Sequence, residues 1–255
     1  MNKPSGKVYP KTHTGRVALI TGAAGALGSH FALRLAESGC DLALTDIRMP
    51  TETIEALAHT GVRVYADAVD LADASAVRAF AEGVLQQFGQ CDILVNNAAY
   101  MPLIPFADLT LEEFRRFEAI NVESALVLAQ ALTPRMKERG YGRIVQIGSS
   151  TTGDPRPGFA AYITTKMAGI GLVRALAAEF GDCGITVNAI HPGLTATESS
   201  RKHLPQALFD AVKDLQLIKR TEVPEDLVGV LAFLTSEEAG FLTGQALNVD
   251  GGTQF

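Results

Sequence analysis

The feature that most constrains the fold of this chain is a repeated alternation of short apolar runs and longer segments with helical periodicity. An apolar run without polar alternation predicts a strand that is buried on both faces of a parallel sheet. A segment with a period of about 3.6 residues after such a run predicts the helix that crosses over to the next parallel strand. The apolar runs are RVALIT, DLALTD, VRVYADAVD, CDILVNNAA, GRIVQIGSS, GITVNAIHPG and QALNVDGG. The helical segments are expected at about 27–38, 51–59, 74–88, 111–139 and 160–180.

This alternation predicts an α/β protein with a doubly wound domain of the Rossmann type, in which helices cover both faces of a mainly parallel seven-stranded sheet. No linker or change of composition divides the 255 residues, so we expect a single domain over 15–255. Residues 1–14 are predicted to form a flexible lead-in. The segment 194–220 fits the alternation worst and follows the carboxyl end of a strand, where open α/β sheets bind ligands. It is predicted to be a lid over the ligand.

Composition excludes several other classes of protein. Apolar residues make up 47% of the chain and charged residues 20%, so the chain can bury a large core. The net charge of -6 comes without a basic stripe, which argues against nucleic acid or an anionic membrane as partner. The longest uncharged run, 93–107, is interrupted by Asn and Pro, and the N-terminus has no apolar block typical of a signal peptide. Three scattered cysteines indicate reduced thiols in a cytoplasmic protein, and the five histidines lack the spacing of metal ligands.

The first apolar run leads into a glycine-rich turn, TGAAGALG, at residues 21–28. Gly22 and Gly28 would let the backbone approach a pyrophosphate, and the following helix would present its free N–H groups. This spacing is not the G-x-G-x-x-G fingerprint of dinucleotide-binding domains. It resembles T-G-x-x-x-G-x-G, the variant found in short-chain dehydrogenases/reductases, with Ala26 in place of the middle glycine.

Further motifs follow in the order and at the spacing of that family. They are NNAA at 96–99, YITTK at 162–166, HPG at 191–193, VPEDLVGVLAFL at 223–234 and TGQALNVDGG at 243–252. The resemblance to the short-chain dehydrogenases/reductases therefore extends over 16–252. It implies an oxidoreductase that transfers hydride between a nicotinamide cofactor and a small alcohol or ketone. The family commonly forms homotetramers, so a homotetramer, or a homodimer, is implied as well.

The preferred cofactor is expected to be NAD. Asp46 ends the second strand, about two dozen residues after Gly22, where a carboxylate accepts hydrogen bonds from both ribose hydroxyls and repels the 2′-phosphate of NADP. Arg48 lies near enough to blur this preference, although an exposed loop arginine is usually just solvated. By resemblance, the cofactor-binding residues are Gly22, Ala24, Leu27, Gly28, Asp46, Ile47, Asp70, Leu71, Asn96, Ala98, Tyr162, Lys166, Pro192, Gly193, Thr195 and Thr197.

Tyr162 and Lys166 match the family's Y-x-x-x-K and stand four residues apart, which places them on one face of a helix. A phenol with a pKa near ~10 is a poor base, but a cation about 4 Å away stabilises phenolate by roughly 4 kcal/mol at an effective dielectric of ~20. We therefore expect Lys166 to lower the pKa of Tyr162 so that the phenol acts as acid and base. The resemblance assigns the partner of the substrate oxygen to Ser149, thirteen residues before Tyr162, with Ser150 as the alternative. It also implies that Asn121 holds a water beside the lysine.

The substrate is harder to infer. Residues expected to line its pocket are Met101, Ser150, Phe159, Leu194 and Phe209, a mostly apolar set that favours a hydrophobic ligand. PLIPF, STT, YITTK and VPEDL are similar to the phenylethanol dehydrogenase branch of the family, which implies a secondary aryl alcohol such as 1-phenylethanol. Alternatives are a ketoacyl-thioester reductase, a sugar or polyol dehydrogenase, and a non-catalytic dinucleotide sensor. A sensor would have no need to keep Ser149, Tyr162 and Lys166 together.

Overall fold

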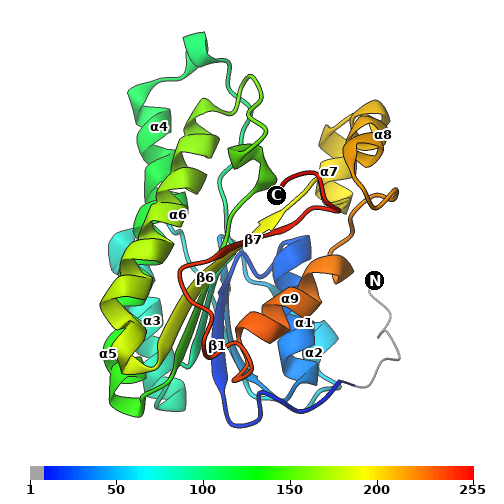
Figure 1. The fold of residues 1–255 in the computed structure, drawn as a ribbon. Helices are drawn as coiled ribbons and strands as arrows, with labels where there is room; N and C mark the ends of the chain where they lie inside the picture. Colours follow the sequence, from blue (N-terminus) through cyan, green and yellow to red (C-terminus); the bar gives the residue numbers. More distant parts are fainter. Residues whose placement is uncertain (1–8) are drawn as a thin grey trace.

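The structure, a computed structural model, describes residues 9–255 and is built on a seven-stranded parallel sheet (Figure 1). The strands lie in the order β3-β2-β1-β4-β5-β6-β7, and each neighbouring pair is parallel. The bounds are β1 Val17–Thr21, β2 Asp41–Asp46, β3 Val64–Ala68, β4 Ile93–Asn96, β5 Gly142–Ile147, β6 Ile185–Pro192 and β7 Ala246–Val249. The predicted fold class is therefore confirmed. The strand order reverses between β1 and β4, and this is where ligands bind in doubly wound sheets.

Helices cover both faces of the sheet (Figure 1). The helices α1, α2 and α9 pack on one face, whereas α3, α5 and α6 pack on the other. The bounds are α1 Ala26–Glu37, α2 Thr51–Leu57, α3 Ala74–Phe88, α4 Leu111–Glu118, α5 Ser124–Arg139, α6 Ala160–Phe180, α7 Glu198–His203, α8 Gln206–Leu215 and α9 Glu225–Leu234. None of these helices, and no other helical stretch within 9–255, combines the length and the apolar character that a bilayer crossing requires.

The core lies in two layers because the central strands are buried on both faces. Every residue of β1, β4, β5 and β6 is buried, which fits their mainly apolar sequences, although β5 and β6 also bury polar side chains such as Arg143 and Asn188. Phe31 and Leu35 of α1 fill the layer on one side of the sheet. Leu128 and Leu132 of α5 fill the layer on the other side. This rigid double layer fixes the carboxyl ends of the strands, from which the functional loops emerge.

The long helix expected over 111–139 is interrupted. A π-helical turn, Ala119–Glu123, separates α4 from α5 without ending the helical path. Asn121, at the centre of this turn, is buried and faces the segment after β4. Such π-turns occur frequently at functional sites.

The segment 194–220 contains α7 and α8, which project beyond the carboxyl edge of the sheet near the C-terminus (Figure 1). Helix α7 begins with a capping box: Thr197 Oγ1 accepts the N–H of Ser200 at 3.0 Å, and Ser200 Oγ accepts the N–H of Thr197 at 2.8 Å. The predicted lid is thus a pair of short helices with a defined start.

The predicted flexible lead-in is only partly within the described residues, because 1–8 lie outside them. Within 9–14, Tyr9 and His13 contact the domain whereas the other four residues are exposed, and the predicted flexibility stays a prediction. His13 is fully buried, its N–H donates to Ser38 O at 3.0 Å, and its Nε2 lies 2.9 Å from Thr235 Oγ1. The guanidinium of Arg34 covers the ring of Tyr9 at 3.9 Å. The contact of His13 with Thr235 joins residues 222 positions apart, which local sequence patterns do not reveal.

Candidate active site

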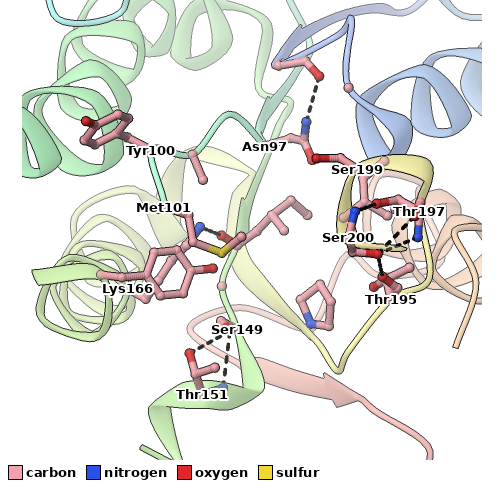
Figure 2. A pocket seen from close by; sticks show the side chains of 18 of the residues that line it. Asn97, Tyr100, Met101, Ser149, Thr151, Lys166, Thr195, Thr197, Ser199 and Ser200 are labelled. Atoms are coloured by element: carbon pink, nitrogen blue, oxygen red, sulfur yellow. Dashed lines mark hydrogen bonds between the residues drawn. The ribbon is translucent and has the colours of Figure 1, made fainter. Parts of the chain in front are cut away.

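A continuous cavity of about 810 Å³ opens at the carboxyl ends of the strands. Its walls come from the loops after β1, β2, β3, β4, β5 and β6, together with α6, the lid and the C-terminal residues. Figure 2 shows Ser149 and Lys166 on one side of this cavity, with Thr195, Thr197 and Ser200 on the other. One space thus contains residues predicted to bind a dinucleotide and residues predicted to perform acid–base chemistry.

The glycine-rich turn leaves no room for side chains. Gly22 adopts φ +67°, and a Cβ there would lie 2.8 Å from both Ala98 Cα and Asn97 Nδ2. A Cβ on Gly28 would lie 2.2 Å from Gly22 O, so the first turn of α1 packs directly on the loop. Asn97 Nδ2 donates to Thr21 O at 2.9 Å and to Gly22 O at 3.2 Å and so fixes the loop from the side of β4. The turn is therefore a rigid cradle of bare backbone, which fits the pyrophosphate of a dinucleotide.

Several predicted cofactor residues line the cavity, whereas others stand behind its wall. Those that line it are Gly22, Leu27, Asp46, Ile47, Asp70, Leu71, Ala98, Tyr162, Lys166, Pro192, Gly193, Thr195 and Thr197. Ala24, Gly28 and Asn96 are not among the lining residues, and their contact with the cofactor stays a prediction. Asn96 is buried, and its Oδ1 has no hydrogen-bond partner among the described residues. Asn97, the second asparagine of the NNAA motif, lines the cavity.

The carboxylate of Asp46 is held at the end of β2. Its Oδ2 accepts the N–H of Ala24 at 3.0 Å, and its Oδ1 accepts the N–H of Ile47 at 2.8 Å. Each carboxylate oxygen has a second lone pair, so both can still accept a ribose hydroxyl. The bond to Ala24 also ties Asp46 to the glycine-rich turn.

Ser149, Tyr162 and Lys166 meet where β5 ends beside α6. Ser149 Oγ lies 2.8 Å from Thr151 Oγ1, and Ser149 is close enough to Tyr162 to act on the pKa of its phenol. Lys166 Nζ donates to Ile147 O at 2.7 Å and lies 5.4 Å from the centre of the Tyr162 ring. The structure therefore brings the predicted catalytic group together, and it places Ser149, not Ser150, against the tyrosine.

The electrostatics of this pair differ from the expectation. Burial raises the pKa of Tyr162 to about 12, although the hydrogen bond from Ser149 opposes the rise. Burial also lowers the pKa of Lys166 to about 8. In the protein alone Lys166 thus loses its proton before Tyr162 ionises, so the expected lowering of the phenol pKa by the ammonium is wrong. Desolvation outweighs the ion–phenolate attraction because both side chains are almost fully buried.

Asn121 does not line the cavity. Its Oδ1 accepts the N–H of Tyr100 at 2.7 Å, and its Nδ2 donates to Tyr100 O and to Thr165 Oγ1, both at 3.0 Å. The side chain thus joins the segment after β4 to α6, one residue before Lys166. Its predicted role in holding a water stays a prediction, and its visible role is to align the elements that carry the site.

Of the predicted substrate residues, Met101, Ser150, Phe159 and Leu194 line the cavity. Phe209 does not: it is 1% exposed and stacks under Arg201 at 5.5 Å, so its predicted contact with substrate is wrong. The preceding residue on α8, Leu208, lines the cavity instead. One residue rotates a side chain about 100° around a helix, and sequence alone did not resolve that difference.

The contribution of the C-terminal residues to the cavity wall was not predicted from the sequence. Thr253 and Gln254 line the cavity, and Gln254 Nε2 donates to the carbonyl of Ser150. Gly251 and Gly252 adopt φ +71° and +81°, which turns the chain back toward the cavity after β7. This glycine pair was the available signal, because positive φ values favour a reversal of direction.

The comparisons with known proteins agree with this geometry. The model of a family described as "Enoyl-(Acyl carrier protein) reductase" matches residues 22–254. D-Threitol dehydrogenase of Mycolicibacterium smegmatis is 35% identical over 247 residues, which cover 93% of this chain and 92% of that protein. The match thus spans more than nine-tenths of both chains and therefore the whole domain.

Several solved structures are also similar to this chain over nearly its whole length. A mutant short-chain dehydrogenase/reductase of Serratia marcescens has a TM-score of 0.88 and 34% identity and covers 95% of this chain and 99% of its own. A 3-oxoacyl (acyl-carrier-protein) reductase of Agrobacterium tumefaciens with NADP bound has a TM-score of 0.88 and 29% identity, with coverage of 95% for both chains. NAD+-bound xylitol dehydrogenase has a TM-score of 0.84 and 31% identity, with coverage of 94% and 99%. On the evidence of its fold, its cavity and these matches, the chain belongs to the short-chain dehydrogenase/reductase family of oxidoreductases.

Proposed function

We propose that this protein is an NAD(H)-dependent dehydrogenase that interconverts a secondary hydroxyl group of a polyol and the corresponding ketone. The observation that carries the proposal is the arrangement of Ser149, Tyr162 and Lys166 in the same cavity as Gly22 and Asp46. A bound nicotinamide dinucleotide would supply the hydride acceptor or donor. The chain supplies position, proton transfer and exclusion of water.

The residues of the catalytic group have distinct roles in this proposal. Tyr162 exchanges the proton with the substrate oxygen, because its phenol lines the cavity. Ser149 lies close to that same phenol at the cavity wall, so its hydroxyl can donate to the substrate oxygen. Lys166 is anchored through its bond to Ile147 O and holds a positive charge beneath the site while it is protonated.

The choice of NAD over NADP rests on Asp46. Its carboxylate points to the cavity at the end of β2 and would repel a 2′-phosphate while accepting ribose hydroxyls. Structural relatives with NADP and with NAD+ are both known, so the relatives do not decide the cofactor. The residues of this chain support NAD.

A polyol is favoured over the aryl alcohol that we expected from sequence. The wall next to Ser149 is polar and is formed by Ser150, Thr151, Asp154, Arg156 and Gln254. The relatives that suggest a substrate are named for threitol and xylitol, and one further relative, 32% identical, is named 2-dehydro-3-deoxy-D-gluconate 5-dehydrogenase. These names support the sugar and polyol alternative.

A neutral polyol fits better than a sugar acid. Arg156 Nη2 lies 2.9 Å from Asp154 Oδ2, so the charge of this arginine is balanced within the wall. An anionic substrate would have to compete with Asp154 for the guanidinium. A hydroxylated neutral chain can accept and donate hydrogen bonds along the same wall without that competition.

The aryl alcohol remains the second candidate because the cavity also has apolar lining residues. Met101, Leu103, Phe159, Leu194 and Leu208 line it. A phenyl ring would find van der Waals contacts there, and the thioester substrate of an acyl carrier protein is a third possibility only by family likeness.

The experiment is a substrate panel with the purified protein. Formation of NADH or NADPH is measured with threitol, xylitol, gluconate, 1-phenylethanol and 2-propanol, each with NAD+ and with NADP+. We expect kcat/KM with a neutral polyol and NAD+ to exceed that with 1-phenylethanol by about tenfold or more, equivalent to 1.4 kcal/mol. The reverse order would restore the aryl alcohol, and no turnover of any alcohol would refute the dehydrogenase.

Self-association is a further proposal. Exposed apolar side chains lie on two separate faces: Leu126 of α5 and Met167 of α6 on one, and Phe233 and Phe241 in and after α9 on the other. These are the helices and the C-terminal region that a homotetramer with two kinds of two-fold interface would pair. A sedimentation measurement distinguishes tetramer, dimer and monomer.

A further inference from the structure

One buried carboxylate of the site has no part in the proposed chemistry. Glu222 lies between the lid and α9 and is 4% exposed. Its Oε2 accepts the N–H of Gly193 at 3.0 Å, and its Oε1 accepts the hydroxyl of Thr195. Its backbone carbonyl accepts the N–H of Ala196 at 2.8 Å. Side chain and backbone of Glu222 thus bind the same four-residue loop, 193–196.

This loop forms the cavity wall next to the catalytic group. Gly193 and Thr195 line the cavity, and they follow β6, the strand beside β5 that carries Ser149. A Cβ on Gly193 would lie 3.0 Å from Glu222 Oε2, so only bare backbone separates the carboxylate from the wall. The carboxylate therefore stands directly behind the part of the cavity where hydride transfer is proposed.

Glu222 has no ion pair of its own within the described part of the chain, although the charge of Arg220 is near enough to interact with it. From α9, Asp226 faces it but is paired with Arg220, at 2.6 Å for each of two bonds. From the end of β7, Asp250 faces it and is itself buried with an unpartnered Oδ2. A buried carboxylate beside two others is costly to ionise, so a nearby cation would stabilise its charged form.

Two basic groups, His191 of β6 and Lys166 of α6, belong to the elements next to the catalytic group. His191 of β6 lies close enough to Lys166 of α6 for the lysine charge to lower its pKa further, after the larger effect of burial. His191 is also under the field of Asp250. Glu222 thus sits at the acidic end of a short buried series of titratable groups that ends at Lys166.

We propose that Glu222 is a positioning residue that holds the loop 193–196 and, through its negative charge, favours the oxidised, cationic form of the nicotinamide ring over the reduced, neutral form. The inference rests on the proposed function, because it assumes that a nicotinamide dinucleotide occupies the cavity. Solvent and salt screen a buried charge only weakly. The carboxylate of Glu222 should therefore act more strongly on a cationic ring on the other side of the loop 193–196 than a surface charge would. NAD+ and NADH differ by this one charge and share nearly all other contacts.

The consequence for pH follows from the state of the carboxyl group. Burial raises the pKa of Glu222 to about 7, although the hydrogen bonds from Thr195 and Gly193 oppose the rise. Below that pH the group is neutral, so the preference for the cationic ring should weaken as the pH falls from 8 to 6. A bound cationic ring would in turn lower the pKa of Glu222 by linkage.

The test measures the dissociation constants of NAD+ and of NADH separately, by calorimetry, without turnover. Glu222→Gln keeps an acceptor for Gly193 and a donor for Thr195 but removes the charge. We expect it to weaken NAD+ binding about five- to tenfold and to leave NADH binding within about twofold. The wild-type ratio of the two constants should change more between pH 8 and 6 than the ratio in the variant, where Lys166 still titrates but Glu222 does not.

Controls separate this role from a merely structural one. Glu238→Gln removes the same charge from an exposed position beyond α9 and should change neither constant. Glu222→Ala also removes both hydrogen bonds and should weaken both ligands, whereas Glu222→Gln should restore NADH binding. If Glu222→Gln weakens NAD+ and NADH equally, or neither, the inference is wrong while the proposed function stands. If the wild-type protein binds neither dinucleotide, the proposed function fails and the inference fails with it.

Discussion

His13 makes the stability of this fold sensitive to acid in a way that can be measured. The imidazole is fully buried, and its Nε2 donates to Thr235 Oγ1, because the hydroxyl of Thr235 already donates to Leu231 O at 2.8 Å. Its Nδ1 then accepts from Thr12 Oγ1 at 2.9 Å. Both ring nitrogens are thus satisfied in the neutral form. Burial, and secondarily the charge of Arg34, lowers the pKa of His13 from 6.5 to about 4.

The sign of the effect follows from proton binding. Between the folded-state pKa of about 4 and the unfolded-state value of 6.5, the unfolded chain binds more protons at His13 than the folded protein does. Stability contributed by neutral His13 is therefore complete above the unfolded-state pKa and is lost as the pH falls. The full shift corresponds to about 3 kcal/mol, of which roughly 2 kcal/mol is lost between pH 7 and pH 5.

The assay is urea unfolding at pH 7 and pH 5, at one protein concentration, of the wild type and of His13→Gln. The variant removes the titration, so between the two pH values it should lose about 2 kcal/mol less than the wild type. It should also be less stable at pH 7 by about 1 kcal/mol, because one hydrogen bond is weakened. His59→Gln, at an exposed position, is the matched control and should follow the wild type. Equal losses in the wild type and in His13→Gln would refute the reasoning.

Two further predictions concern the proposed site. Tyr162→Phe should lower kcat by about hundredfold or more while NADH still binds within a few-fold, because only the proton-transferring hydroxyl is removed; single-turnover kinetics and NADH fluorescence measure the two effects, and retained turnover would exclude Tyr162 as acid and base. Asp46→Ala should narrow the preference for NAD+ over NADP+ by about tenfold, because a repelling charge and two acceptors are lost. The ratio of the two kcat/KM values measures this, and an unchanged ratio would mean that another group contacts the ribose.

The fold was predictable because its signals are local and periodic. The helices predicted at 74–88 and 160–180 have those same bounds in the structure, since apolar periodicity and their flanking turns lie next to each other in the chain. The buried state of His13 was not predictable, because its partner Thr235 is 222 residues away. Gln254 escaped for the same reason, since it reaches a carbonyl 104 residues away.

The site shows the same division. The four-residue spacing of Tyr162 and Lys166 was enough to place them on one helix face, and the family resemblance added Ser149 at the end of the neighbouring strand. Their pKa values were not predictable from spacing, because desolvation depends on every element that packs over them. Glu222 reads as an ordinary acid in an exposed loop, and only the structure places it against Gly193.

The pKa values of Lys166 and Tyr162 indicate when the buried phenol can take part in proton transfer. With a pKa of about 8 for Lys166 and about 12 for Tyr162, the protein alone has an ammonium and a neutral phenol at pH 7. Removing the phenol proton is unfavourable by roughly 7 kcal/mol at that pH, because five pKa units separate it from the solution. A bound cation beside the phenol would offset part of this cost, and the ammonium would offset more once its own proton is stabilised by the forming phenolate. On the proposed function, ionisation of Tyr162 is thus unfavourable until the oxidised cofactor is bound. Deprotonation of the alcohol is therefore disfavoured in a complex that has no acceptor for its hydride.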